Sequence, residues 1–154
     1  MDGQALVQAT IEWDPAVQKR DQADRPAVQV PPEKLPALMR HLRDEPATAF
    51  DLLLDHTAID WLDRGQLELV YNLYSTRHGH YLMVSTFVPR DNPVAPTVSG
   101  VWPIAHWQER EAYDMFGVLY DGHPDLRRVF LDDDWQGFPL RKDYSDPDML
   151  ELPK

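Results

Sequence analysis

The chain has 154 residues, 43% of them hydrophobic, and its 26 acidic and 15 basic side chains give a formal net charge of −11. These values predict one globular domain and disfavour binding to nucleic acid or to an anionic membrane surface. The absence of cysteine excludes disulfides, thiolate-bound zinc and cysteine-ligated iron–sulfur clusters. No apolar run approaches the ~18–20 residues that span a bilayer, and residues 1–10 show no secretion signal.

The first segment, residues 1–32, is mixed in charge. It has one aromatic residue, Trp13, and prolines gather near its end at Pro26, Pro31 and Pro32. Proline restricts the backbone and removes a hydrogen-bond donor. We therefore interpret this segment as a partly ordered N-terminal arm that ends in a rigid linker.

A short helix is predicted at residues 33–44, where apolar side chains recur at i, i+3, i+4 and i+7. Pro36 fits only the first helical turn, and Pro46 ends the element. The apolar stripe consists of Leu35, Leu38, Met39 and Leu42.

Strands are predicted in the middle of the chain from alternating side chains, at residues 50–55, 67–74 and 81–88. Gly79 lies between the last two strands and can adopt the positive φ of a tight turn. These two strands are therefore expected to pair as an antiparallel hairpin. Two prolines in residues 90–97 predict a loop.

A second helix is predicted between Pro103, which suits a first turn, and Gly117, which suits the left-handed position after a helix end. At 100° per residue its side chains separate into two arcs. The apolar arc, expected to pack on the sheet, holds Val101, Ile104, Ala105, Ala112, Met115 and Phe116. The opposite arc, expected to face outward, holds His106, Trp107, Arg110, Glu111 and Asp114. A tryptophan beside an arginine and carboxylates is typical of an interface anchor.

The same helix offers little for catalysis. Glu109 and Glu111 point about 200° apart, so they cannot act together as a carboxylate pair. His106 and Glu109 match part of the zinc motif H-x-x-E-H, but Arg110 occupies the place of the second histidine and cannot bind a metal. A small metal-dependent hydrolase using His106, Glu109 and Asp114 remains an alternative of another functional class.

The remaining sequence favours protein binding. In residues 123–128, HPDLRR, Pro124 restricts the backbone and two arginines place guanidinium groups on opposite sides, ready for bidentate pairing with carboxylates. Farther on, aromatic residues recur without helical or alternating spacing and need cover from a neighbour. We divide the chain into an arm and linker (1–32), a single α+β domain (33–131) and an extended partner-binding tail (132–154).

Residues 102–144 resemble the C subunit of NADH-quinone oxidoreductase, the 30 kDa subunit family of respiratory complex I. The family signature is carried by WQEREAYDMFGVLYDGHPDLRR at residues 107–128 and by DDWQGFPLRKDY at residues 133–144. Four positions depart from the usual residue without removing a charged signature residue. They are His106, Tyr120, Phe130 and Ser145.

The resemblance implies an α+β fold with a mixed, largely antiparallel sheet covered by helices. It also implies a peripheral-arm subunit of the proton-pumping enzyme, located at the cytoplasmic face of the cell membrane. Flavin mononucleotide (FMN), iron–sulfur clusters and quinone would then belong to partner subunits. The chief neighbour would be the D subunit, which helps to form the quinone site, and subunits B and I would be further neighbours. An equivalent subunit of a ferredoxin-fed or hydrogenase-type membrane complex is the main alternative. The residues expected to bind partners are Trp107, Glu109, Arg110, Glu111, Asp114, Gly117, Gly122, His123, Pro124, Asp125, Arg127, Arg128, Asp133, Trp135, Arg141, Lys142 and Tyr144.

Overall fold

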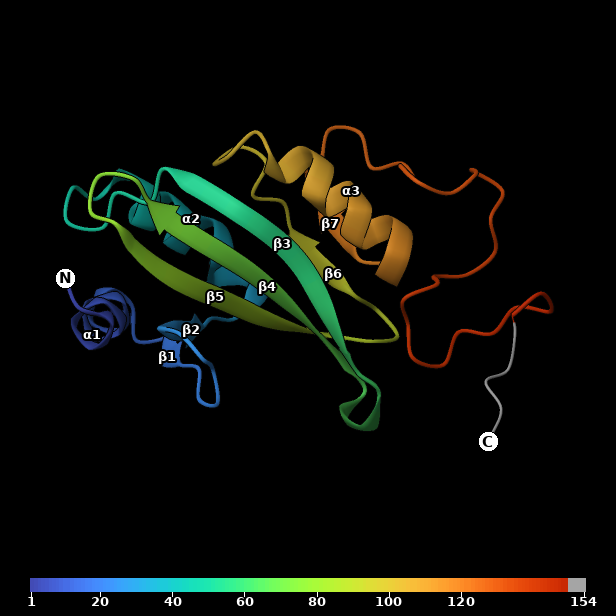
Figure 1. The fold of residues 1–154 in the computed structure, drawn as a ribbon, viewed down its shortest axis with the longest axis horizontal. Coiled ribbons are helices and arrows are strands. Elements are labelled where there is room, and N and C mark those ends of the chain that lie inside the picture. The colour runs from blue at the N-terminus through green and yellow to red at the C-terminus, as the bar shows by residue number, and fades with distance from the viewer. Residues whose placement is uncertain (150–154) are drawn as a thin grey trace.

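A five-stranded mixed sheet forms the centre of the computed structural model, which describes residues 1–149 (Figure 1). Across the sheet the strands are β1 (Gln18–Lys19), β2 (Ala27–Gln29), β5 (His80–Pro89), β4 (Gln66–Ser75) and β3 (Leu52–Trp61). Only β2 and β5 run parallel; the other neighbours are antiparallel. A separate parallel pair joins β6 (Val94–Pro96) to β7 (Leu119–Asp121). The predicted α+β class with a largely antiparallel sheet is confirmed.

The three long strands form an antiparallel meander, because Gly65 and Gly79 adopt positive φ values of 64° and 65° at its two turns. The predicted hairpin of β4 and β5 is confirmed. The first strand, β3, continues to Trp61 and is longer than predicted. Its register shifts near residue 54, and two of the inward positions beyond the shift are the polar residues His56 and Asp60. The alternation of apolar and polar residues is therefore not visible in the sequence. The predicted loop at residues 90–97 is also wrong in part, since β6 lies within it.

The core is continuous from the N-terminal elements to the sheet. Helix α2 (Leu35–Asp44), preceded by the short 3-10 helix η1 (Pro32–Lys34), buries all four residues of its predicted apolar stripe. Helix α1 (Gly3–Trp13) is capped by Asp2, whose carboxylate accepts the Ala5 amide at 2.8 Å. Leu6 of α1 and Val28 of β2 are fully buried in the same core. Helix α1 and strand β2 thus pack against the domain, whereas we expected residues 1–32 to form a partly ordered arm.

Helix α3 (Ala105–Phe116) lies along β3, close to the small β6–β7 pair (Figure 1). It ends as predicted at Gly117, which has φ 80° and donates its N–H to the Tyr113 carbonyl at 2.8 Å. Its apolar arc enters the core at Ala105, Ala112 and Phe116, whereas Ile104 is exposed.

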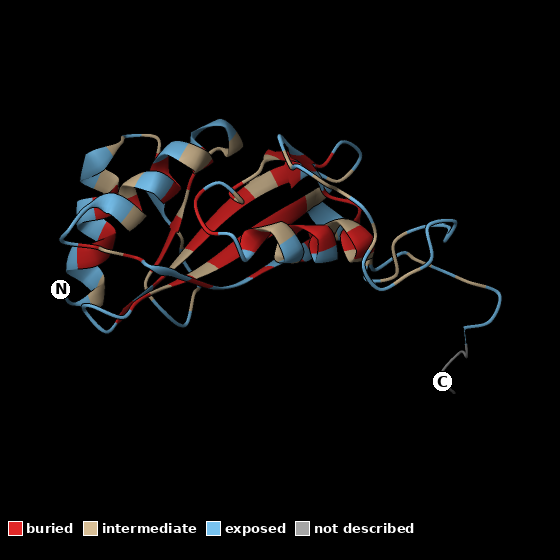
Figure 2. Cartoon of the chain, turned by 90° about the horizontal axis from the view of Figure 1, so that it is seen from above, coloured by how far each residue is buried: buried red, intermediate tan, exposed pale blue. Residues whose placement is uncertain are grey.

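The C-terminal segment beyond β7 has no regular secondary structure up to residue 149, and it runs along α3 before extending from the body (Figures 1 and 2). Most of its residues are exposed or half-buried (Figure 2). Positions 150–154 of the predicted tail lie outside the described residues.

Within residues 1–149, no helix combines the length and apolar character needed to cross a membrane. The short 3-10 helix η2 (Leu62–Arg64) completes the elements described.

Candidate interaction surface

A buried ion pair between Asp114 and Arg128 fastens the C-terminal segment to α3. One Asp114 oxygen accepts Arg128 Nη1 at 2.8 Å, and the other accepts three consecutive backbone amides. These amides belong to Val129, Phe130 and Leu131, at 3.1, 2.7 and 3.2 Å. Burial alone would raise the pKa of Asp114, but Arg128 and the amides outweigh it and hold the pKa below its usual value.

Arg110 adds a second attachment, one helical turn before Asp114. Its guanidinium donates to the carbonyls of Arg127 and Arg128 at 3.1 and 3.2 Å. The Trp107 ring covers that guanidinium at 4.8 Å and stays 56% exposed itself. The Asp114–Arg128 pair and Arg110 together hold residues 127–131 along the helix.

The outward arc predicted for α3 is therefore wrong for Arg110 and Asp114, which are buried at 5% and 0% exposure. Helix periodicity separates two arcs correctly, but it does not show that a later segment of the same chain covers the second arc. Trp107 and Glu111 are exposed as expected.

Glu109 lies inside the domain and joins α3 to the chain before it. Its carboxylate accepts the Val98 amide at 2.7 Å and the Thr97 hydroxyl at 2.5 Å. Burial raises the pKa of Glu109 to about 7, because these two hydrogen bonds offset only part of the lost solvation. We expected Glu109 to bind a partner, whereas in this structure its carboxylate is used internally.

His123 is buried beside Glu109 and connects the segment after β7 to α3. Its Nε2 lies 2.9 Å from the His106 carbonyl, and its Nδ1 accepts the Asp125 amide at 3.0 Å. This pattern requires a neutral ring with the proton on Nε2. Burial lowers the pKa of His123 and so favours that neutral form, although Glu109 Oε2 lies 3.8 Å away. Gly122, at φ 81°, allows the chain to turn just before His123.

A second buried ion pair, between Asp60 and Arg90, holds residues 141–143 of the C-terminal segment to the sheet. Arg90 donates to Asp60 at 2.5 and 2.8 Å and to Asp143 at 2.7 Å. The side-chain hydrogen bonds from Arg90 lower the pKa of Asp60, which also accepts the Lys142 amide at 2.8 Å. Arg141 donates to the carbonyls of Phe116 and Arg90 at 2.7 and 3.1 Å.

Two glycines allow aromatic rings of the tail to pack against backbone. A Cβ built on Gly117 would lie 2.6 Å from the Phe138 ring, and one on Gly137 would lie 3.0 Å from the Tyr144 ring. Both glycines have positive φ values, 80° and 83°. The part of the tail that includes Phe138 and Arg141 therefore packs on its own chain, whereas we expected the whole tail to await a partner.

The side chains left exposed form the candidate interaction surface on α3 and the C-terminal segment. Asp125 and Arg127 pair with each other at 2.7 Å near the exposed Pro124. Trp107 and Trp135 are 56% and 38% exposed. The exposed predicted residues are Trp107, Glu111, Gly122, Pro124, Arg127, Asp133, Trp135 and Lys142.

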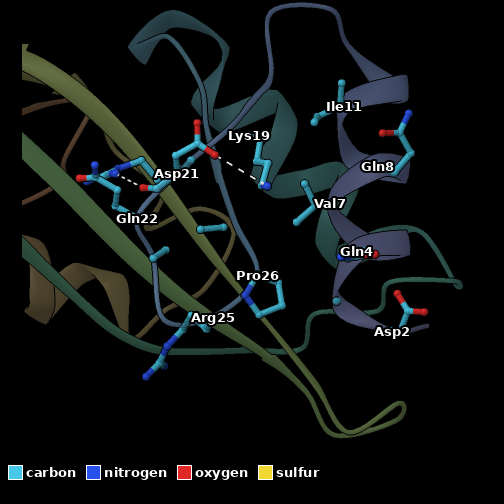
Figure 3. A pocket seen from close by; sticks show the side chains of 14 residues that line it. Asp2, Gln4, Val7, Gln8, Ile11, Lys19, Asp21, Gln22, Arg25 and Pro26 are labelled. Atoms are coloured by element: carbon cyan, nitrogen blue, oxygen red, sulfur yellow. Dashed lines mark hydrogen bonds and ion pairs between the residues drawn. The ribbon is translucent and has the colours of Figure 1, made fainter.

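The geometry does not favour the hydrolase alternative. Asp114 is occupied by Arg128 and backbone amides, and Glu109 is occupied by Thr97 and Val98. Among residues 1–149 no group of three or more His, Asp or Glu side chains is arranged to hold a metal ion. A cavity of about 710 Å³ lies elsewhere, between α1 and residues 19–27, with Val7, Ile11 and Pro26 in its lining (Figure 3). It shares no lining residue with α3 or with the C-terminal segment.

The sequence did not predict the Asp60–Arg90 pair or the hydrogen bonds from Thr97 and Val98 to Glu109. Asp60 and Arg90 are 30 positions apart, and neither lies in a recognisable motif. An acidic residue at an inward position of a strand was the one signal available for Asp60, since buried carboxylates need a partner.

The fold and these contacts define an α+β domain that holds a C-terminal segment on one helix and exposes aromatic side chains there, a residue type enriched at protein interfaces. The sequence matches the family described as respiratory-chain NADH dehydrogenase, 30 Kd subunit, over residues 28–148. The chain belongs to this family, so the resemblance found in the sequence is confirmed.

Curated relatives agree with this assignment. The NADH-quinone oxidoreductase C subunit of Moorella thermoacetica is 40% identical over 130 residues, covering 84% of this chain and 86% of the relative. The protein of the same name from Salinispora arenicola is 42% identical over 119 residues, covering 76% of this chain and 49% of the relative. The chain thus spans about half the length of the Salinispora relatives that it matches.

Two solved structures share the fold. One is a chain of the membrane-bound sulfane sulfur reductase, an archaeal respiratory membrane complex, with a TM-score of 0.79 and 31% identity over 93% of this chain and 85% of that chain. The other is a trypsin-resistant fragment of Nqo5, with a TM-score of 0.63 and 30% identity over 80% of this chain and 97% of that chain.

Proposed function

We propose that this chain is a peripheral-arm subunit of a proton-pumping NADH-quinone oxidoreductase and acts there by binding its neighbours. The observation that carries the proposal is the use of the signature charges. Asp114, Arg110 and Arg128 hold the C-terminal segment on α3 instead of converging on a substrate-sized site. Their chemistry serves to position a surface, and exposed aromatic side chains lie on that surface.

The chief partner is proposed to be the D subunit of that enzyme, with subunits B and I as further neighbours at the cytoplasmic face of the membrane. Electron transfer from NADH to quinone would use FMN and iron–sulfur clusters held by those and other subunits, and this chain would supply no redox centre. Two features support this division: the chain has no cysteine, and its charge of −11 disfavours direct attachment to an anionic membrane. The contacts would involve the exposed side chains of the candidate interaction surface.

A second candidate is the equivalent subunit of a related membrane complex with another electron donor. The observation in its favour is the structural match to the sulfane sulfur reductase chain, whose TM-score of 0.79 exceeds the 0.63 of the Nqo5 fragment. Because a fold can serve several complexes, that match concerns the module and not the electron donor.

Co-purification tests the proposal. The chain would be produced with subunits D, B and I of the same organism and purified through a tag on the D subunit. We expect a stoichiometric complex that contains this chain. Membranes from a strain lacking the chain would then be assayed for quinone reduction with NADH and with reduced ferredoxin, before and after the chain is restored. Restoration with ferredoxin alone would favour the second candidate, and absence of the chain from the purified complex would contradict the subunit assignment.

A further inference from the structure

A loop at residues 129–137 is closed at both ends by the Asp114–Arg128 pair. At its start, Asp114 accepts the amides of residues 129–131. At its end, Arg128 Nη2 donates to the carbonyls of Trp135 and Gly137 at 3.1 and 3.0 Å. Since Arg128 and Asp114 also bind each other at 2.8 Å, a single buried ion pair fixes the two ends of the loop.

The loop directs apolar side chains into solvent. Phe130 is 65% exposed, and Val129 and Trp135 are each 38% exposed. The Phe130 amide is bound to Asp114 at 2.7 Å, so the backbone that carries this ring is fixed although the ring itself has little cover. A preformed loop with an exposed aromatic side chain loses little conformational entropy on binding, which favours its use as an anchor.

Three carboxylates, Asp132, Asp133 and Asp134, follow the exposed phenylalanine, and all three residues are exposed. None of them forms an ion pair with any side chain of residues 1–149. In contrast, Asp114, Asp60, Asp125 and Asp143 are all paired with arginine. Arg127 acts on Asp133 only from beyond ion-pair distance. The loop therefore combines an apolar tip with carboxylates that form no ion pair within residues 1–149, and its complement is an apolar pocket rimmed by cations.

We propose that Phe130 inserts into an apolar pocket of the neighbouring subunit, and that lysine or arginine side chains around this pocket face Asp132, Asp133 and Asp134. The inference rests on the proposed function, and it specifies the chemistry of the partner surface. The Asp114–Arg128 pair acts as a positioning element, because it holds the loop in shape before the partner arrives.

The test measures the affinity of the full-length chain for the purified D subunit at low and moderate salt. Phe130→Ala removes the ring, Phe130→Leu keeps an apolar side chain, and a triple Asp→Asn variant of residues 132–134 removes the charges. Tyr81→Ala is the matched control, since Tyr81 is an aromatic residue of β5 with 48% exposure outside the loop. Thermal melting of each variant confirms that it is folded.

We expect Phe130→Ala to weaken binding about 30-fold, the loss typical of a central aromatic anchor. Phe130→Leu should recover most of the affinity, and Tyr81→Ala should bind like the wild type. The triple variant should show a smaller salt dependence than the wild type, because its attraction to the cationic rim is lost.

Wild-type binding together with an unaffected Phe130→Ala variant would overturn the inference and leave the proposed function standing. The same holds if the triple variant keeps the wild-type salt dependence. Absence of wild-type binding to the D subunit would remove the proposed function, and with it the partner that the inference requires.

Discussion

Replacing Asp114 with alanine tests whether the buried ion pair holds the C-terminal segment. The variant removes the carboxylate that accepts hydrogen bonds from three backbone amides and from the Arg128 guanidinium, which is 8% exposed. Removing one partner of a buried pair costs about 3–5 kcal/mol. Arg128 keeps three carbonyl acceptors, those of Asp114, Trp135 and Gly137, so we expect the lower end, about 3 kcal/mol.

A loss of about 3 kcal/mol lowers the melting temperature of a domain of this size by roughly 6–12 °C. Chemical unfolding in guanidinium chloride measures the free-energy change, and limited proteolysis reports on the loop at residues 129–137. Asp114→Asn keeps one acceptor oxygen and should lose about half as much. Glu111→Ala is the control, because Glu111 is an exposed acid of the same helix and should change stability by less than about 0.5 kcal/mol. Equal stability of Asp114→Ala and Glu111→Ala, with unchanged cleavage of the loop, would refute the reasoning.

Three other changes separate the remaining contacts. Burial raises the pKa of Glu109 from 4.5 to about 7, so the folded state binds the proton more tightly and loses stability as the pH rises through this interval. Glu109→Gln should remove this pH dependence. The stability of the variant relative to the wild type should therefore rise with pH over this interval, by up to roughly 1.4 kcal/mol per pH unit. A stability difference that is independent of pH would contradict the raised pKa of Glu109. Gly117→Ala should cost about 2–3 kcal/mol in thermal unfolding, because the strain of a positive φ adds to the clash with the Phe138 ring. Gly65→Ala, at a positive φ but with no neighbour within 4 Å, should cost only about 1 kcal/mol. Equal losses for the two variants would disprove the contact with Phe138. Arg90→Ala leaves Asp60 buried without its cation and should cost about 3 kcal/mol in chemical unfolding. Arg127→Ala breaks an exposed ion pair and should cost less than about 1 kcal/mol. Similar losses for both variants would show that burial of the ion pair does not affect its contribution to stability.

Local patterns were sufficient for several elements of the fold. The apolar spacing at Leu35, Leu38, Met39 and Leu42 predicted α2, and the alternation at residues 67–88 predicted the β4–β5 hairpin. Gly117 marked the end of α3, because a positive φ after a helix favours glycine whatever packs nearby. In each case the signal depends on residues within a few positions of each other, so the sequence contains all the information needed.

Residues 1–32 depended on tertiary contacts. Leu6 and Val28 belong to short apolar groups, residues 5–7 and 27–28, and neither group is long enough to mark a helix or a strand by itself. Both are fully buried because α1 and β2 pack against β5, which is formed by residues more than fifty positions later. β3 was shortened in the prediction for a related reason, since His56 and Asp60 are polar at inward positions. Tyr120 and Arg90, far along the chain, supply their hydrogen-bond partners.

The charged residues of the family signature show most clearly what the sequence determines and what the tertiary structure determines. The sequence by itself identified the family and selected Arg110, Asp114, Arg128 and Arg141 as important side chains. Only the tertiary structure decided that these four side chains bind their own chain, because their partners are carbonyls, amides and charged groups from other segments. Arg141, for example, donates to the Arg90 carbonyl across 51 positions. Helix periodicity defines the direction in which each side chain points around the helix axis. Burial of a side chain depends instead on which distant segment covers it, and this is determined only when the whole chain packs.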